Sequence, residues 1–71
     1  MENQIRGAVF SKFSSISAFA DTIGWKRNKA SRIVNGTQKP SAEDMERMAL
    51  CLNITDANDF ISIFFPALFT M

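Results

Sequence analysis

The sequence predicts an all-α fold, a compact bundle of about five short helices in a single domain of residues 1–71. Apolar residues recur at intervals of three and four, the spacing that places them on one face of a helix. Serine, glycine and proline residues interrupt this pattern where helices would begin and end. No two alternating runs of apolar and polar residues are joined by a turn, so no strand is predicted. A hydrophobic content of 46% is enough for one small core.

Two helices are predicted before Gly24. The first covers residues 3–13, with its apolar face formed by Ile5, Val9 and Phe13. The second covers residues 16–23, with its buried stripe formed by Ile16, Phe19, Ala20 and Ile23. Ser15 is a favoured N-cap for it, and Gly24 readily adopts the left-handed conformation found just past a helix.

The third predicted helix, residues 27–34, has one narrow apolar face and ends at Gly36. The apolar positions are Ala30, Ile33 and Val34. Polar and basic side chains occupy the remaining surface, namely Lys26, Arg27, Asn28, Ser31, Arg32 and Asn35. We therefore expect this helix to bury one side and to present charge on the other.

A loop over residues 37–40 leads to the fourth predicted helix, which Ser41 caps. Asp44 lies three residues later and completes a capping-box pattern. The inner face of this helix consists of Met45, Met48, Ala49 and Leu52. Cys51 belongs to the same helix, and we expect it to be a partly buried, unreactive thiol.

The last predicted helix covers residues 56–65, between a Thr55 cap and Pro66. Its segment, residues 56–71, has more apolar side chains than one face of a short helix can bury. Those expected to pack on the core are Phe60, Ile61 and Phe64. Those left outside, as a dimer or partner interface, are Ile63, Phe65, Leu68 and Phe69. Three arrangements would cover this patch: folding back over the first and fourth helices, self-association, or a partner protein.

Charge is distributed unevenly along the chain. Residues 22–42 carry five basic side chains and no acidic one, whereas the remaining three basic and seven acidic residues sum to −4. Such a charge dipole orients a molecule toward a polyanion, and DNA is the partner we expect. The alternative interpretation is a basic helix face that is merely solvated.

The residue inventory excludes several classes of function. The chain has no histidine and a single cysteine, so neither an internal disulfide nor a zinc site is expected. No nucleophile–base pair or phosphate loop indicates an enzyme, and no cofactor is expected. The N-terminus lacks the regions of a signal peptide, and Ser62 and Pro66 interrupt the longest apolar stretch. We therefore expect a protein in the cytoplasm of a bacterial or phage-infected cell, without membrane contact.

The segment around Gly24 has the residues of a tight turn between crossing helices. Ala20 is small where the next helix would pass over it, and Gly24 supplies a positive backbone angle. We interpret Trp25 as a core residue that anchors the turn, and not as a surface on which nucleic acid stacks. Ala30 and Ile33 would dock the third helix onto the second.

This pattern extends beyond the turn through Ala20, Gly24, Ile33, Asn35-Gly36, Pro40-Ser41, Met48-Ala49 and Leu52. With it, residues 16–54 resemble the helix-turn-helix of the phage Cro and repressor family, also called lambda-repressor-like or Xre. The resemblance implies a transcriptional regulator, expected to be a repressor of phage or mobile-element origin. It also implies a homodimer on double-stranded DNA, at a near-palindromic operator whose half-sites lie about 34 Å apart.

The start of the third helix points into the major groove in this family. The resemblance therefore assigns base contacts to Lys26, Arg27, Asn28, Ser31 and Arg32. Arginine can donate two hydrogen bonds to guanine, and asparagine can pair doubly with adenine. Arg27, Asn28 and Arg32 are thus the expected main readers, each good pair contributing roughly 1–3 kcal/mol of discrimination. The assigned phosphate contacts are Ser17, Lys29, Asn35, Gln38 and Lys39.

The sequence departs from the family pattern at two informative positions. Ile16 stands where a phosphate-clamping glutamine is frequent, which leaves Ser17 as a weak substitute. Val34 stands where many members have a glutamate that pairs with an arginine of the first helix. We expect an apolar contact with Val9 in place of that ion pair.

A second class of function is a protein-interaction module, such as the antitoxin half of a toxin–antitoxin pair. In that alternative the hydrophobic C-terminal tail binds a partner protein, and the fold stays the same. That alternative is still compatible with DNA binding.

Overall fold

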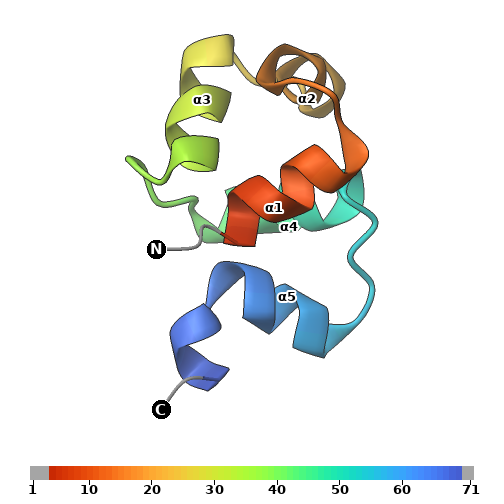
Figure 1. Cartoon of the computed structure of the whole chain (residues 1–71), viewed down its shortest axis with the longest axis vertical. Coiled ribbons are helices and arrows are strands. Elements are labelled where there is room, and N and C mark those ends of the chain that lie inside the picture. The colour runs from red at the N-terminus through yellow and green to blue at the C-terminus, as the bar shows by residue number, and fades with distance from the viewer. Residues whose placement is uncertain (1–3, 70–71) are drawn as a thin grey trace.

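The structure is a computed structural model that describes residues 4–69, and its secondary structure is entirely helical (Figure 1). The described residues contain no strand, and the predicted all-α fold is confirmed. The elements are α1 (Gln4–Lys12), α2 (Ile16–Ile23), α3 (Arg27–Asn35), α4 (Ala42–Cys51), α5 (Ala57–Phe64) and the 3-10 helix η1 (Pro66–Phe69). Residue 3, the predicted start of the first helix, lies outside the described residues.

The apolar core lies between helices α1 to α4 and includes Leu52, the residue that follows α4. Its members are Val9, Phe19, Ala20, Ile23, Ala30, Ile33, Val34, Met48 and Leu52. Phe19 is fully buried, and its ring packs edge-on against Phe13 and Trp25, with centroids 5.6 and 5.7 Å away. Burial of a large apolar side chain contributes roughly 1.5–3 kcal/mol, so this cluster stabilises the bundle.

The ends of α2 form as predicted. The Ser15 hydroxyl accepts a hydrogen bond from the Ala18 amide at 3.1 Å, which satisfies one of the free N–H groups of the first turn. Gly24 follows the helix with φ 82°, a left-handed conformation, and its N–H donates to the Ala20 carbonyl at 2.9 Å. A side chain at that backbone angle is strained, which explains the glycine.

The capping box of α4 is also confirmed. The Asp44 amide donates to the Ser41 hydroxyl, and the Ser41 amide donates to the Asp44 carboxylate, each at 3.1 Å. The predicted cap of the last helix is wrong by one position, because Asp56 caps α5 and Thr55 does not. The Asp56 carboxylate accepts from the Asn58 amide at 2.8 Å, and Thr55 precedes the position from which a side chain reaches that amide.

Helix α5 lies beside α1, and no residue of α5 is fully buried. Phe64 packs against the core as expected. The Phe60 ring contacts that of Phe64, with centroids 4.8 Å apart and planes tilted by 51°, but neither Phe60 nor Ile61 packs on the core cluster. The prediction that all three would pack on the core is therefore wrong for Phe60 and Ile61. A helix that covers the bundle from one side can bury only one stripe of its surface.

The predicted interface residues differ in exposure. Ile63 is half-buried, whereas Phe65 is 43% and Leu68 63% exposed. The side chain of Phe69 lies outside the part of the chain that the structure describes. Figure 1 shows α2 and α3 at one end of the molecule and α5 with η1 at the other. Phe65 nevertheless lies near the C-terminal end of α3, because it lines a pocket together with Ile33 and Lys39.

Candidate nucleic-acid interface

A short turn joins α2 to α3 and is fixed by the backbone of α2. The Ala20 carbonyl accepts hydrogen bonds from the amides of Gly24 and Trp25, at 2.9 and 3.0 Å. Trp25 is half-buried and packs against the core, as the sequence predicts. Figure 1 views α2 nearly along its axis while α3 lies across the view, so the two helices cross steeply.

Helix α3 has two chemically different sides. Ala30, Ile33 and Val34 are fully buried in the core and hold the helix in place. The exposed side chains on and beside it are Lys26, Arg27, Asn28, Arg32, Asn35 and Lys39. Ser31 and Gln38 are half-buried at the edge of this surface. Four of the predicted base-contacting residues thus lie on α3, and the fifth, Lys26, is its N-cap residue.

The C-terminal end of α3 is connected to α1 by a hydrogen bond that sequence reasoning missed. The Arg6 guanidinium donates to Asn35 Oδ1 at 2.7 Å, and Asn35 Nδ2 donates to the Ser31 hydroxyl at 3.2 Å. The Arg6 guanidinium carbon also lies 4.9 Å from the centroid of the Phe10 ring. Arg6 therefore adds a cation beside Asn35, although it is 29 residues away in the sequence.

The expected apolar substitute for the family's ion pair is compatible with the packing. Val34 and Val9 are both fully buried in the same cluster. In the family pattern an arginine of the first helix pairs with the residue at position 34, and this pattern was the available signal for a contact made by Arg6. Asn35, rather than the residue at position 34, is its partner here.

The loop after α3 is held against the end of that helix. Gly36 adopts φ 85°, and the amides of Thr37 and Gln38 both donate to the Arg32 carbonyl, at 2.9 and 3.2 Å. The Gln38 side-chain oxygen accepts from Arg32 Nε at 3.0 Å. This bond orients the Arg32 guanidinium. Lys39, on the same loop, is exposed.

Two of the predicted phosphate contacts differ from the others in placement. Ser17 is half-buried in the first turn of α2. Lys29 turns toward α4, where its Nζ lies 2.9 Å from Asp44 Oδ1, and it also lies over the Trp25 ring, 4.7 Å from the centroid. Lys29 is thus engaged within the protein.

The environment of Asp44 favours its charged form. The side chain is buried, and burial alone would raise its pKa, but the hydrogen bonds from Lys29 and Ser41 and the charge of Lys29 outweigh this cost. The pKa of Asp44 is therefore lowered from its ordinary value of 3.8. A negative carboxylate in the first turn also complements the dipole of α4.

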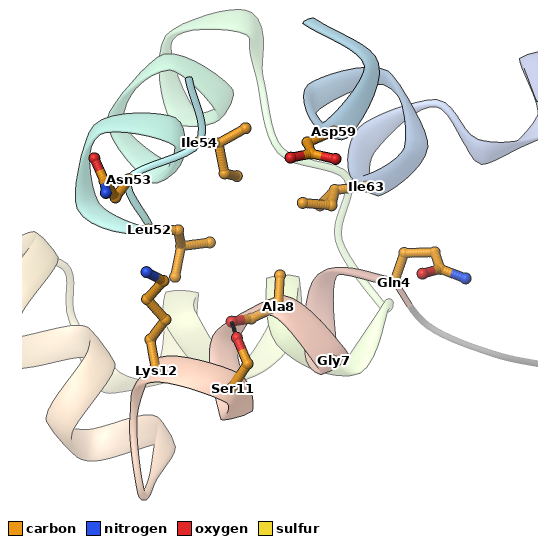
Figure 2. A pocket seen from close by; sticks show the side chains of 10 residues that line it. All are labelled: Gln4, Gly7, Ala8, Ser11, Lys12, Leu52, Asn53, Ile54, Asp59 and Ile63. Atoms are coloured by element: carbon orange, nitrogen blue, oxygen red, sulfur yellow. Dashed lines mark hydrogen bonds between the residues drawn. The ribbon is translucent and has the colours of Figure 1, made fainter. Parts of the chain in front are cut away.

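A separate cleft of about 390 Å³ lies between α1, the α4–α5 connection and α5 (Figure 2). Ala8, Leu52 and Ile63 contribute apolar surface, while Lys12 and Asp59 reach its rim from α1 and α5. Ile63 is the predicted interface residue that lines it. None of the residues assigned to DNA contacts lines this cleft.

Other kinds of site have little support in the described residues. Residues 4–69 contain no cluster of three or more acidic, cysteine or histidine side chains able to hold a metal ion. In this part of the chain no helix is long and apolar enough to cross a membrane. Cys51 is half-buried, and burial raises the pKa of its thiol above the ordinary 9.0, which disfavours the reactive thiolate.

The chain matches no protein-family model, and no curated protein or solved structure is significantly similar to it.

Proposed function

We propose that the protein binds double-stranded DNA sequence-specifically and regulates transcription, with α2, the turn and α3 acting as a helix-turn-helix. In this proposal α3 enters the major groove and α2 crosses the sugar-phosphate backbone. Repression is the expected outcome, because a bound protein of this kind occludes its operator. The proposal places the protein in the cytoplasm, where bacterial and phage DNA lie.

The division of α3 into two sides carries this proposal. Three fully buried residues anchor the helix, while its outer side has exposed cations and amides. No carboxylate interrupts residues 22–42. A firmly held cationic helix suits the phosphate field of DNA, and its arginine and asparagine side chains suit base edges.

The proposed contacts follow from position on this surface. Arg27 and Asn28, in the first turn of α3, read bases, together with Lys26, Ser31 and Arg32. Asn35, Gln38 and Lys39 contact phosphates near the end of the helix, and Ser17 does so from α2. Arg6 joins the phosphate contacts because its guanidinium lies 2.7 Å from Asn35.

A homodimer on a near-palindromic operator completes the proposal. Phe65 and Leu68 are large exposed apolar side chains, and Leu68 belongs to η1, which lies at the end of the molecule away from α3. Burial of Leu68 against a second copy would leave both α3 helices free for DNA.

The test is a fluorescence-anisotropy titration with a random-sequence duplex and with a duplex selected from a random pool, over a range of salt. Log affinity should fall linearly with log salt, with a slope of roughly 0.9 per phosphate neutralised. Arg27→Ala should lower affinity for the selected duplex by about 1–3 kcal/mol and affect the random duplex little. Lys39→Met, the control, should weaken both duplexes alike and reduce the slope by about 1.

Absence of binding at low salt, or affinity independent of salt, would contradict the proposal. Equal losses on both duplexes for Arg27→Ala would contradict the assignment of Arg27 to base reading.

A further inference from the structure

Lys29 differs from the other basic residues of the 22–42 segment in its surroundings. Arg27, Arg32 and Lys39 are exposed, whereas the Lys29 side chain is 35% exposed and its ammonium contacts two protein groups. One is the Asp44 carboxylate at 2.9 Å, and the other is the face of Trp25 at 4.7 Å from the ring centroid. Its charge is therefore largely neutralised within the molecule.

The Asp44 carboxylate joins this contact to the start of α4. Its Oδ1 accepts from Lys29, while Oδ2 accepts from the Ser41 amide at 3.1 Å. Both oxygens are thus fixed, and the side chain is only 12% exposed. Movement of Lys29 would disturb Oδ1 of Asp44. The other oxygen of the same carboxylate, Oδ2, belongs to the capping box of α4.

Trp25 joins the same ammonium to α2. The Trp25 ring packs edge-on against Phe19, with centroids 5.7 Å apart, and Phe19 is fully buried. Lys29 in the first turn of α3 is therefore connected to α4 through Asp44 and to the core of α2 through Trp25. We call the set Trp25, Lys29 and Asp44 the latch.

We propose that Lys29 is a positioning residue, and not a DNA contact: the latch fixes the first turn of α3 and thereby the direction in which Arg27 and Asn28 point. This inference rests on the proposed DNA-binding function. It replaces the sequence-based assignment of Lys29 to a phosphate. Loss of the latch should therefore impair base reading while leaving the number of phosphate contacts unchanged.

The experiment compares Lys29→Met, Lys29→Arg and the matched control Lys39→Met on the selected and random duplexes. Lys29→Met retains an unbranched apolar stem and removes only the cation. It should lower affinity for the selected duplex about tenfold, leaving the random duplex and the salt slope nearly unchanged. Lys29→Arg keeps the charge and should restore most of the affinity, whereas Lys39→Met should reduce the slope by roughly 0.9.

The single tryptophan gives a readout that does not depend on DNA. Its emission responds to a charge over the indole ring, so Lys29→Met should alter the emission of Trp25 in the free protein. Lys39→Met should leave that emission as in the parent. An unchanged emission for Lys29→Met, or a salt slope reduced as in Lys39→Met, would overturn the inference.

Asp44→Asn provides a second variant if Lys29→Met does not fold. It removes the negative charge from the latch and keeps a side-chain oxygen for the Ser41 amide. By itself Asp44→Asn should lower affinity for the selected duplex about tenfold, because it breaks the same contact. Where Lys29→Met folds, these two single variants and the double variant should show nearly the same loss. Additive losses would overturn the latch.

Failure of the proposed function gives a different result. A parent protein that binds no duplex overturns DNA binding and the positioning role together. The tryptophan emission of the variants then still decides whether the latch exists in the free protein.

Discussion

Single side chains in this molecule serve more than one element, and Asp44 illustrates the consequence for stability. Its carboxylate caps α4 and binds Lys29 of α3, so one ionised group stabilises two contacts. The folded state lowers its pKa below the ordinary value of 3.8. This contribution to stability is therefore complete above the unfolded-state pKa and is lost as pH falls through the lower folded-state pKa.

Stability should consequently decline below about pH 4 in the parent, and less so in Asp44→Asn. At pH 7 we expect Asp44→Asn to be less stable by about 1 kcal/mol, a modest value because Lys29 is partly exposed. Urea denaturation followed by circular dichroism between pH 2 and pH 7 measures both proteins. A constant difference across that range would contradict the assignment to Asp44.

At the scale of the element, backbone conformation determines where a helix ends. Gly7 and Gly24 allow the effect of backbone conformation on stability to be distinguished from the effect of side-chain packing. An added Cβ would meet nothing within 4 Å at either Gly7 or Gly24. Gly7 lies inside α1, whereas Gly24 has φ 82° at the end of α2. Any difference between alanine substitutions at these positions must therefore come from the backbone.

Gly7→Ala should stabilise the protein by about 0.5–1 kcal/mol, because alanine restricts the unfolded chain and favours a helix. Gly24→Ala should destabilise it by about 1–2 kcal/mol, because the left-handed conformation is strained for a residue with a Cβ. Thermal unfolding of both variants tests this pair, and each kcal/mol corresponds to a shift of roughly 4–8 °C for a domain of this size. Equal shifts would contradict the backbone explanation.

At the scale of the whole molecule, α3 and η1 lie at opposite ends. The basic side of α3 lies at one end, and η1 with its exposed Leu68 lies at the other. This separation suits the proposed dimer, because one surface can bind DNA while the other associates.

Leu68→Asp should then shift the parent from dimer to monomer in size-exclusion chromatography with light scattering, because a carboxylate in an apolar interface is strongly unfavourable. Leu50→Asp is a matched control, since Leu50 is also exposed, at 79%, but belongs to α4. A parent that is monomeric at high concentration, or equal behaviour of the two variants, would exclude the dimer interface at η1.

The sequence by itself determined the helices, most of their caps and the segregation of charge. Each of these features depends on residues within about four positions of one another, so local chemistry is sufficient to predict it. This holds for helical periodicity, for the caps at Ser15 and Ser41, and for the helix ends at Gly24 and Gly36. The assignment of the last cap to Thr55 was wrong by one residue, because the neighbouring Asp56 is a better N-cap than threonine.

Only the tertiary structure decided which side chains meet across helices. The bond of Arg6 to Asn35 spans 29 residues, and that of Lys29 to Asp44 spans 15. Neither leaves a local sequence signal, because both depend on how α1, α3 and α4 pack. The same packing decides that Leu68 is exposed while Phe64 is held against the core. A short helix can turn only one stripe toward its neighbours, and the orientation of that stripe is set by the whole bundle.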